Sequence, residues 1–207
     1  MIVVHHLNNS RSQRILWLLE ELSLPYEIRF YQRDPVTNLA PPELEAVHPL
    51  GKSPVITDGA VTIAESGAII DYILRKYGAG RLAPAPDAAD YEAYLEWLHY
   101  AEGSAMLPLM LLLYTMRLGE AAAPLKDRID GEIANHLGYV NRALSGRLYL
   151  LGKTFTGADV QMSFVGEVAR AFGRLGDFPD IAAWVERLHA RTAFKAALER
   201  GGAYNLA

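Results

Sequence analysis

Residues 52–66 read KSPVITDGAVTIAES, and this stretch decides the fold. Ser53-Pro54 fixes the backbone just before a β-branched run, which predicts the start of a strand. Asp58-Gly59 is a strong two-residue hairpin signal, so a second strand should run back beside the first. That second strand ends at Glu65-Ser66, where helical spacing begins. We therefore expect a β-hairpin followed at once by a helix.

The helix after Glu65 is expected to begin with Ser66 as its cap and to stop at Gly78. Its start presents free backbone N–H groups and the positive end of the helix dipole. Lys52 precedes the same hairpin, so an anion is expected to bind at this place. The apolar positions that recur at one-four spacing are Ile69, Ile70, Ile73, Leu74 and Tyr77.

The chain before residue 52 extends this pattern into an alternating order of strands and helices. Apolar runs, helical spacing and period-two alternation together predict the order β-α-β-α-β-β-α for residues 1–77. The upstream elements are a strand at 2–4, a polar turn at 8–12, a helix over 15–22, a strand over 25–31 and a short helix at 42–47.

With a proline that we expect to be cis at the opening of the third strand, this order resembles the thioredoxin-like fold. Residues 1–77 look like the glutathione-binding domain of the cytosolic glutathione transferase family, and the active-site turn Asn-Ser-Arg is most similar to that of bacterial or fungal members. An Ala/Pro-rich linker and then only helical patterns follow, as in that family. Thr156-Gly157-Ala158-Asp159 resembles its capping box, in which Thr156 satisfies the Asp159 N–H and the Asp159 carboxylate reaches back.

The resemblance implies the fold class α/β plus all-α. A thioredoxin-like N-terminal domain would be joined to an all-helical C-terminal domain. The expected boundaries are 1–78 for the glutathione-binding domain, 79–87 for the linker and 88–207 for the helical domain. The resemblance also implies a homodimer, with the helix after Glu65 packing across a two-fold axis against the long helix after Tyr91.

No cysteine occurs among the 207 residues. Because a thiolate is the nucleophile in thiol chemistry, disulfide exchange through an enzyme cysteine and the cysteine-type transferase classes are excluded. Any thiol chemistry must use the thiol of bound glutathione, the co-substrate that the resemblance implies. Lowering the pKa of that thiol by about two units means favouring the thiolate by about 2.7 kcal/mol.

The net charge is −4 and the signs are interspersed, so neither a nucleic-acid partner nor a polybasic membrane patch is expected. The apolar run from Met106 to Met116 is interrupted by Pro108 and is too short for a membrane span. The N-terminus lacks the pattern of a secretory signal. The six histidines show no ligand spacing, so no metal is expected. A cytoplasmic protein with small-molecule partners is the expectation.

The residue that activates the thiol is expected in the turn after the first strand. When the family's Ser-type classes are aligned on Ile15, their activating serine falls on Asn9, and Ser10 lies one residue further. Ser10 offers a hydroxyl, Asn9 an amide N–H, and the backbone N–H of either is a third donor. The alternative is that Ser10 or Ser12 only caps the helix. Both Ser10 and Asn9 are candidates, and Ser10 is slightly preferred over Asn9.

The glutathione-binding residues follow from the resemblance. Lys52 would meet the glycine carboxylate, although most lysines are simply solvated. The Val55 backbone would pair with the cysteinyl part like an added strand. Glu65 would accept the γ-glutamyl ammonium or be an ordinary first-turn acid, and Ser66 would bind the adjoining carboxylate while capping the helix. The whole expected set is Lys52, Ser53, Pro54, Val55, Glu65 and Ser66.

Met106, Met110 and Tyr114 repeat at helical spacing, which is typical of a core. By resemblance, this helix also lines the pocket for an apolar electrophile, and Tyr204 is a candidate lid over it. The expected activity is addition of the glutathione thiolate to such electrophiles, a detoxification reaction. Two alternatives remain open: reduction of organic hydroperoxides with glutathione, and a binding or regulatory protein that keeps the fold without turnover.

Overall fold

The computed structural model describes residues 1–202 and 204–206. The chain forms two compact units. The first consists of residues 1–83 together with residues 188–206, and the second consists of residues 84–187. This grouping differs from the division made by sequence, because a C-terminal helix packs on the first helix of the N-terminal unit. The division into separately folding domains stays a prediction.

The first unit is built on a sheet whose strands lie in the order β2-β1-β3-β4. β1 runs parallel to β2 and antiparallel to β3, and β3 and β4 form the expected hairpin. With α1 after β1 and α2 after β4, the predicted thioredoxin-like order is confirmed in this unit. The elements are β1 Ile2–Leu7, α1 Ser12–Glu21, β2 Tyr26–Tyr31, β3 Val55–Asp58, β4 Val61–Ala64, α2 Ser66–Tyr77 and α8 Thr192–Gly201.

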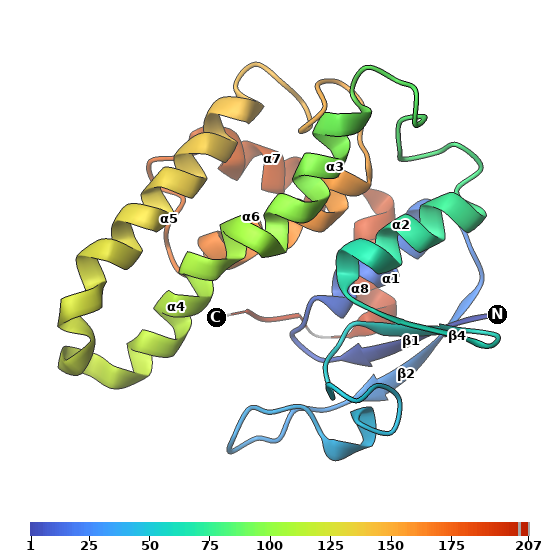
Figure 1. Cartoon of the computed structure of the whole chain (residues 1–207), viewed down its shortest axis with the longest axis horizontal. Helices are drawn as coiled ribbons and strands as arrows, with labels where there is room; N and C mark the ends of the chain where they lie inside the picture. Colours follow the sequence, from blue (N-terminus) through green and yellow to red (C-terminus); the bar gives the residue numbers. More distant parts are fainter. Residues whose placement is uncertain (203, 207) are drawn as a thin grey trace. The chain divides into compact units, whose positions relative to one another are not determined.

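The two faces of this sheet are covered differently. Strand alternation sends Ile2, Val4 and His6 of β1 to one face, and α1, α2 and α8 lie over it (Figure 1). Val3 and His5 point to the other face, along which the segment between β2 and β3 runs. The adjacent histidines therefore lie in different surroundings.

The expected short helix at 42–47 is a single 3-10 turn, η1 Pro42–Leu44. Leu44 is the side chain that this turn buries, in a small cluster with Leu7 and Tyr31. One turn is enough to place that side chain, and 3-10 geometry suits short pieces. The η1 segment therefore covers one end of the second sheet face.

The hairpin turn lies one residue later than the sequence predicts. Asp58 is the last residue of β3 and pairs with Val61, so Gly59 (φ 63°) and Ala60 make the turn. The Asp58 carboxylate accepts hydrogen bonds from three α2 side chains, and the bond from Lys76 is the largest of the effects that hold its pKa well below the usual range. These hydrogen bonds hold Asp58 at the end of β3, so it is not part of the turn. Their donors are Tyr72, Lys76 and Tyr77.

The second unit is helical, as expected. A π-helical turn, η2, joins α3 to α4, and η3 leads from α4 to α5 through a backbone reversal at Gly119 (φ 54°, ψ −129°). α6 packs against α3 and α4 and is buried along most of its length. The elements are α3 Tyr91–Tyr100, η2 Ala101–Ala105, α4 Met106–Thr115, η3 Met116–Ala122, α5 Ala123–Leu144, α6 Gly157–Ala171 and α7 Pro179–His189.

The predicted capping box at the start of α6 is confirmed. Thr156 is the N-cap, and its side chain and that of Asp159 satisfy each other's backbone N–H groups. Asp159 Oδ2 accepts the Thr156 N–H at 3.0 Å, while Oδ1 accepts the Leu150 N–H and Trp184 Nε1–H, each at 3.0 Å. Asp159 has no exposed surface. This carboxylate ties the helix start, the preceding loop and α7 together.

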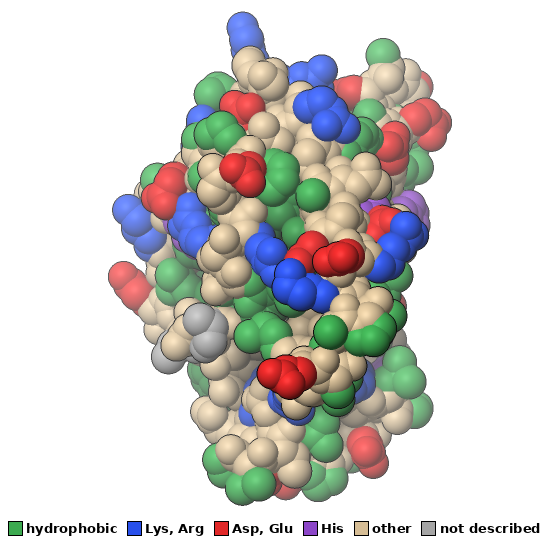
Figure 2. Space-filling view, turned by 90° about the vertical axis from the view of Figure 1, so that its left-hand side faces the viewer, with side chains coloured by type: hydrophobic (Ala, Val, Ile, Leu, Met, Phe, Trp, Pro, Cys, Tyr) green, Lys and Arg blue, Asp and Glu red, His purple; other side chains and the backbone are tan. Residues whose placement is uncertain are grey.

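By length and composition alone, the helical run Tyr91–Leu144 contains a window apolar enough to cross a membrane. The run is not one straight helix, since it reverses at Gly119, and 22% of that window is buried. On the face drawn in Figure 2, Lys and Arg side chains lie among Asp and Glu side chains. On α5, for example, Arg128 pairs with Glu132 at 2.7 Å.

Candidate active site

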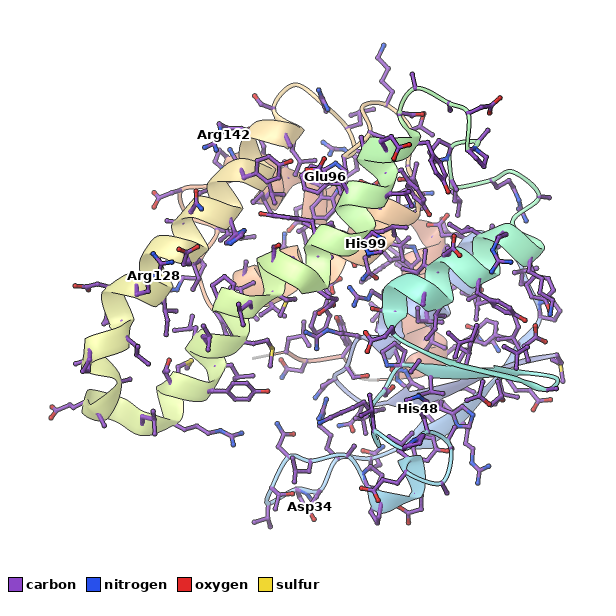
Figure 3. All side chains as sticks on the ribbon, in the orientation of Figure 1. Asp34, His48, Glu96, His99, Arg128 and Arg142 are labelled. Atoms are coloured by element: carbon purple, nitrogen blue, oxygen red, sulfur yellow. The ribbon has the colours of Figure 1, made fainter. Side chains whose placement is uncertain are left out.

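The turn between β1 and α1 is held by an arginine that sequence reasoning missed. The Arg33 N–H donates to Asn8 Oδ1 at 2.8 Å, and the Arg33 guanidinium donates to the carbonyls of Asn8 and Asn9 at 3.2 and 3.4 Å. The next residue, Asp34 (Figure 3), accepts the Thr37 N–H at 2.7 Å and closes the loop that carries Arg33. Asn9 has a left-handed backbone (φ 50°), which asparagine tolerates better than most residues.

Asn9 has a defined side-chain orientation. Its Oδ1 accepts the backbone N–H of Asn205 at 2.7 Å. Because a backbone N–H can only donate, the atom facing Asn205 is the amide oxygen. Among the residues that the structure describes, Asn9 Nδ2 has no acceptor within hydrogen-bonding distance. The amide group therefore has two N–H donors available to a ligand.

Ser10, by contrast, belongs to a buried chain of hydroxyl groups. It is 4% exposed, its Oγ accepts the Ser12 N–H at 3.2 Å, and the two serine hydroxyls lie 2.8 Å apart. Ser12 Oγ in turn lies 2.9 Å from His6 Nδ1.

The direction of this chain follows from His6. Burial lowers the pKa of His6, so the imidazole is neutral, while a hydrogen bond to the Gly201 backbone favours a proton on the ring. With that proton shared with Gly201, the Ser12 hydroxyl has two acceptors, His6 Nδ1 at 2.9 Å and the Leu7 carbonyl at 3.3 Å. The Ser10 hydroxyl then donates to Ser12 Oγ. In this arrangement the Ser10 hydroxyl proton is hydrogen-bonded to Ser12 and does not point to a ligand.

The Ser-Pro turn lies at the other edge of the site. The Ser53–Pro54 peptide bond is cis, as predicted. Ser53 Oγ donates to the His5 carbonyl at 2.9 Å and accepts the Leu7 N–H at 3.4 Å, so this side chain joins the turn to β1. Val55 is fully buried and pairs with β1, and Lys52 is exposed.

The start of α2 carries the other two predicted binding residues. Glu65 is the N-cap residue, is exposed, and has φ 67° and ψ 115°, a strained backbone for a residue with a side chain. Its side chain makes no capping hydrogen bond. Ser66 is 3% exposed, and its Oγ accepts a hydrogen bond of 2.6 Å from Arg14 Nη2.

Arg14 is a second residue that sequence reasoning missed. It lies on α1, is 3% exposed, and brings a buried positive charge behind Ser66. Because Arg14 donates to Ser66 Oγ, the Ser66 hydroxyl proton can point toward a ligand. The guanidinium, the hydroxyl and the helix N-terminus all favour a carboxylate at this position. The signal in the sequence that could have found it is a charged residue directly before the apolar run that begins at Ile15.

The residues predicted to bind the electrophile lie in both units. On α4, Met106 is 2% exposed, Met110 is half-buried and Tyr114 is 60% exposed. Tyr204 lies in the C-terminal segment of the other unit and is half-buried. Their grouping around one substrate stays a prediction. Within the described ranges, no three or more His, Cys, Asp or Glu residues are grouped so that they could hold a metal.

Two family models match the chain. The model of the glutathione S-transferase N-terminal domain matches residues 1–75, and that of the C-terminal domain matches residues 104–192. Among curated proteins, glutathione S-transferase 3 of Schizosaccharomyces pombe is 36% identical over 97% of this chain and 88% of its own length. Glutathione S-transferase 1 of Saccharomyces cerevisiae is 33% identical over 98% and 96%.

Solved structures agree with these matches. A glutathione S-transferase from Actinobacillus pleuropneumoniae has a TM-score of 0.89 and 34% identity, covering 100% of this chain and 94% of that one. A glutathione transferase family member from Pseudomonas fluorescens, solved with two glutathione bound, has a TM-score of 0.80 and 26% identity, with coverage of 96% and 92%. The predicted family and fold class are confirmed.

Proposed function

The chain belongs to the glutathione S-transferase family and is an enzyme of that class, and we propose that it adds the thiolate of glutathione to apolar electrophilic substrates. Relatives that carry this name cover nearly the whole chain. Glutathione is the co-substrate, and the donors at the start of α2 match its γ-glutamyl carboxylate. Detoxification of such electrophiles in the cytoplasm is the role that fits this chemistry.

The peptide would lie along β3 and the start of α2. The γ-glutamyl carboxylate binds Ser66 and the N-terminus of α2, with Arg14 behind them, and the ammonium pairs with Glu65. The Val55 backbone holds the cysteinyl part, and Lys52 meets the glycine carboxylate. The buried contact from Arg14 to Ser66 and the exposed carboxylate of Glu65 support this pose.

Asn9 is the donor that we propose for the sulfur of glutathione. The observation that carries this choice is the 2.7 Å hydrogen bond from the Asn205 N–H to Asn9 Oδ1, which leaves the amide N–H groups for the ligand. Ser10 fits this role less well, because its buried hydroxyl lies 2.8 Å from Ser12 Oγ within the fold. A charge-assisted hydrogen bond to the thiolate is worth about 1.5 to 3 kcal/mol.

The electrophile pocket and the assembly are further parts of this proposal. Met106, Met110 and Tyr114 on α4 offer an adaptable apolar wall, with Tyr204 as a lid. A homodimer that pairs α2 with the helices after Tyr91 across a two-fold axis follows the family pattern. Sedimentation at micromolar concentration tests the assembly directly, and a monomer would contradict it.

The test of the mechanism is ultraviolet titration of bound glutathione in two variants. Asn9→Ala should raise the pKa of the bound thiol by about one to two units, because it removes the donor to the thiolate. Ser10→Ala, the neighbouring control, should leave the titration unchanged while lowering the melting temperature. If Ser10→Ala shifts the titration and Asn9→Ala does not, Ser10 is the donor. Unchanged titration in both variants would assign the role to backbone N–H groups.

A further inference from the structure

The second face of the sheet in the first unit carries a hollow of about 600 Å³. It arises because η1 is a single turn that covers only the Leu7 and Tyr31 end of that face. The floor comes from all four strands, and Ala46 and Val47 form a wall. His48 (Figure 3) follows this wall in the segment that leads to β3. The hollow lies on the sheet face opposite α1, α2 and α8.

Strand register brings two rows of side chains onto this floor. In one row, Glu27 of β2 pairs with Val3 of β1, and Val3 pairs with Thr57 of β3. Thr57 in turn pairs with Thr62 of β4. In the next row, Arg29 of β2 pairs with His5 of β1.

His5 places a buried, unpartnered polar atom beneath the hollow. The side chain is 4% exposed and lines the hollow, and Nδ1 lies 2.9 Å from the Tyr31 hydroxyl. Among the described residues, Nε2 has no hydrogen-bond partner. A buried polar atom without a partner costs free energy, so such atoms are uncommon unless a ligand or water satisfies them. Burial, with a smaller effect of Arg29, lowers the pKa of His5, so its ring is neutral.

Two opposite charges stand beside this atom. Glu27 and Arg29 are exposed and two residues apart on β2, so their side chains project from the same face. In the described part of the chain, neither forms an ion pair. In the tautomer whose Nδ1 accepts the Tyr31 hydroxyl, the proton of the His5 ring is on Nε2, next to Arg29. A cation, an N–H donor and hydroxyl groups suit a carboxylate, while Glu27 suits an ammonium.

We propose that this hollow is a second binding site, separate from the glutathione site, for a free α-amino acid with an aliphatic side chain. The carboxylate of the ligand binds the Arg29 guanidinium above the buried His5 Nε2, and its ammonium binds Glu27. Its side chain lies against Val3 and Val47. The site involves none of the residues assigned to glutathione, so the proposal does not rest on the proposed function.

The test is calorimetric titration of the full chain with L-leucine in saturating glutathione, which keeps the first site filled. Saturable binding is expected. Arg29→Gln and Glu27→Gln should each weaken it about tenfold or more, since each removes a charged hydrogen-bond partner. Arg75→Gln on α2 is the matched control, with the same charge change and no expected effect. 4-Methylpentanoate lacks the ammonium and 3-methylbutylamine lacks the carboxylate, so both should bind at least about tenfold more weakly.

A second readout addresses His5 without replacing it. In 15N-edited spectra of the imidazole groups, saturating L-leucine should shift the His5 Nε2 resonance and leave that of His6 unchanged. Absence of saturable leucine binding would overturn the proposal. So would equal weakening by Arg29→Gln and Arg75→Gln, an unmoved His5 resonance, or equal affinity for 4-methylpentanoate.

Discussion

Two helices in this chain, α6 and α2, each have one hydroxyl residue and one acidic residue at their start, but these side chains are used differently. At α6, Thr156 and Asp159 satisfy the first backbone N–H groups, and both side chains are buried. At α2, the exposed Glu65 makes no capping bond, and Ser66 is hydrogen-bonded by Arg14. The α6 start uses its donors within the fold, whereas the α2 start has no side-chain cap, and we propose that a ligand binds there. The difference lies in the position of the acid. In α6 it is three residues after the N-cap and completes a capping box, whereas in α2 it is the N-cap residue itself.

The largest expected effect is at α6. Asp159→Ala removes the acceptor of the Thr156 and Leu150 N–H groups and of Trp184 Nε1–H, so it should lower the free energy of unfolding by about 3 kcal/mol or more. Urea denaturation measures this loss. Asp177→Ala, an exposed acid of the same unit, is the control and should change stability by less than about 0.5 kcal/mol. A similar small change in both variants would contradict the role given to Asp159.

At α2 the corresponding change should affect binding instead. Glu65→Ala leaves the ligand ammonium without its partner and should cost about 2 kcal/mol in glutathione affinity, measured by calorimetry. Its free energy of unfolding should stay within about 0.5 kcal/mol of the parent, because the side chain makes no capping bond. Unchanged affinity would remove Glu65 from the binding site and make the two helix starts alike.

A smaller effect, on stability, distinguishes the backbone strain at Glu65 from the proposed binding role of its side chain. Glu65→Gly should raise the free energy of unfolding by about 1 kcal/mol, because glycine adopts φ 67° without steric cost. The same variant should bind glutathione as weakly as Glu65→Ala. Thermal melting beside calorimetry checks both points. A loss of stability would show that the fold, and not the ligand, requires Glu65.

The smallest effect is expected at Lys52. Its side chain is exposed, so an ion pair with the glycine carboxylate should contribute only about 0.2 to 1 kcal/mol and should weaken as salt is added. Lys52→Ala should therefore lower glutathione affinity several-fold at low salt and hardly at all at high salt. An effect as large as that of Glu65→Ala would mean that Lys52 is shielded from solvent in the complex.

Local sequence predicted those parts of the fold that depend on neighbouring residues. The strand that opens at Ser53-Pro54, the helix that follows Glu65 and the Thr156–Asp159 capping box are confirmed. Spacing along one element specifies each of them. The expected cap is wrong: Ser66 is the first helical residue, Glu65 is the N-cap, and the Ser66 hydroxyl is hydrogen-bonded by Arg14 instead. The predicted helix at 42–47 is longer than the observed 3-10 turn Pro42–Leu44. One turn is enough because Leu44 is the side chain that it buries.

The parts that sequence could not supply join distant residues. Arg14 meets Ser66, Arg33 clamps the turn at Asn9, and Asn205 orients the Asn9 amide. These pairs link side chains and backbone of different elements, so no local spacing encodes them. The preference for Ser10 over Asn9 rested on residue type alone, and the hydroxyl chain to His6 is visible only in three dimensions.

The packing of α8 on α1 bears on how the protein is made. Residues 188–206 complete the unit whose strands and first helices are synthesised long before them. Until α8 emerges from the ribosome, the face of α1 that it covers stays open, and the Asn9 amide lacks the Asn205 N–H that orients it. Contacts between such distant segments form slowly because a long loop must close first. The N-terminal unit therefore stays incomplete during most of the synthesis of the chain. At that stage its exposed apolar surface is a binding site for chaperones.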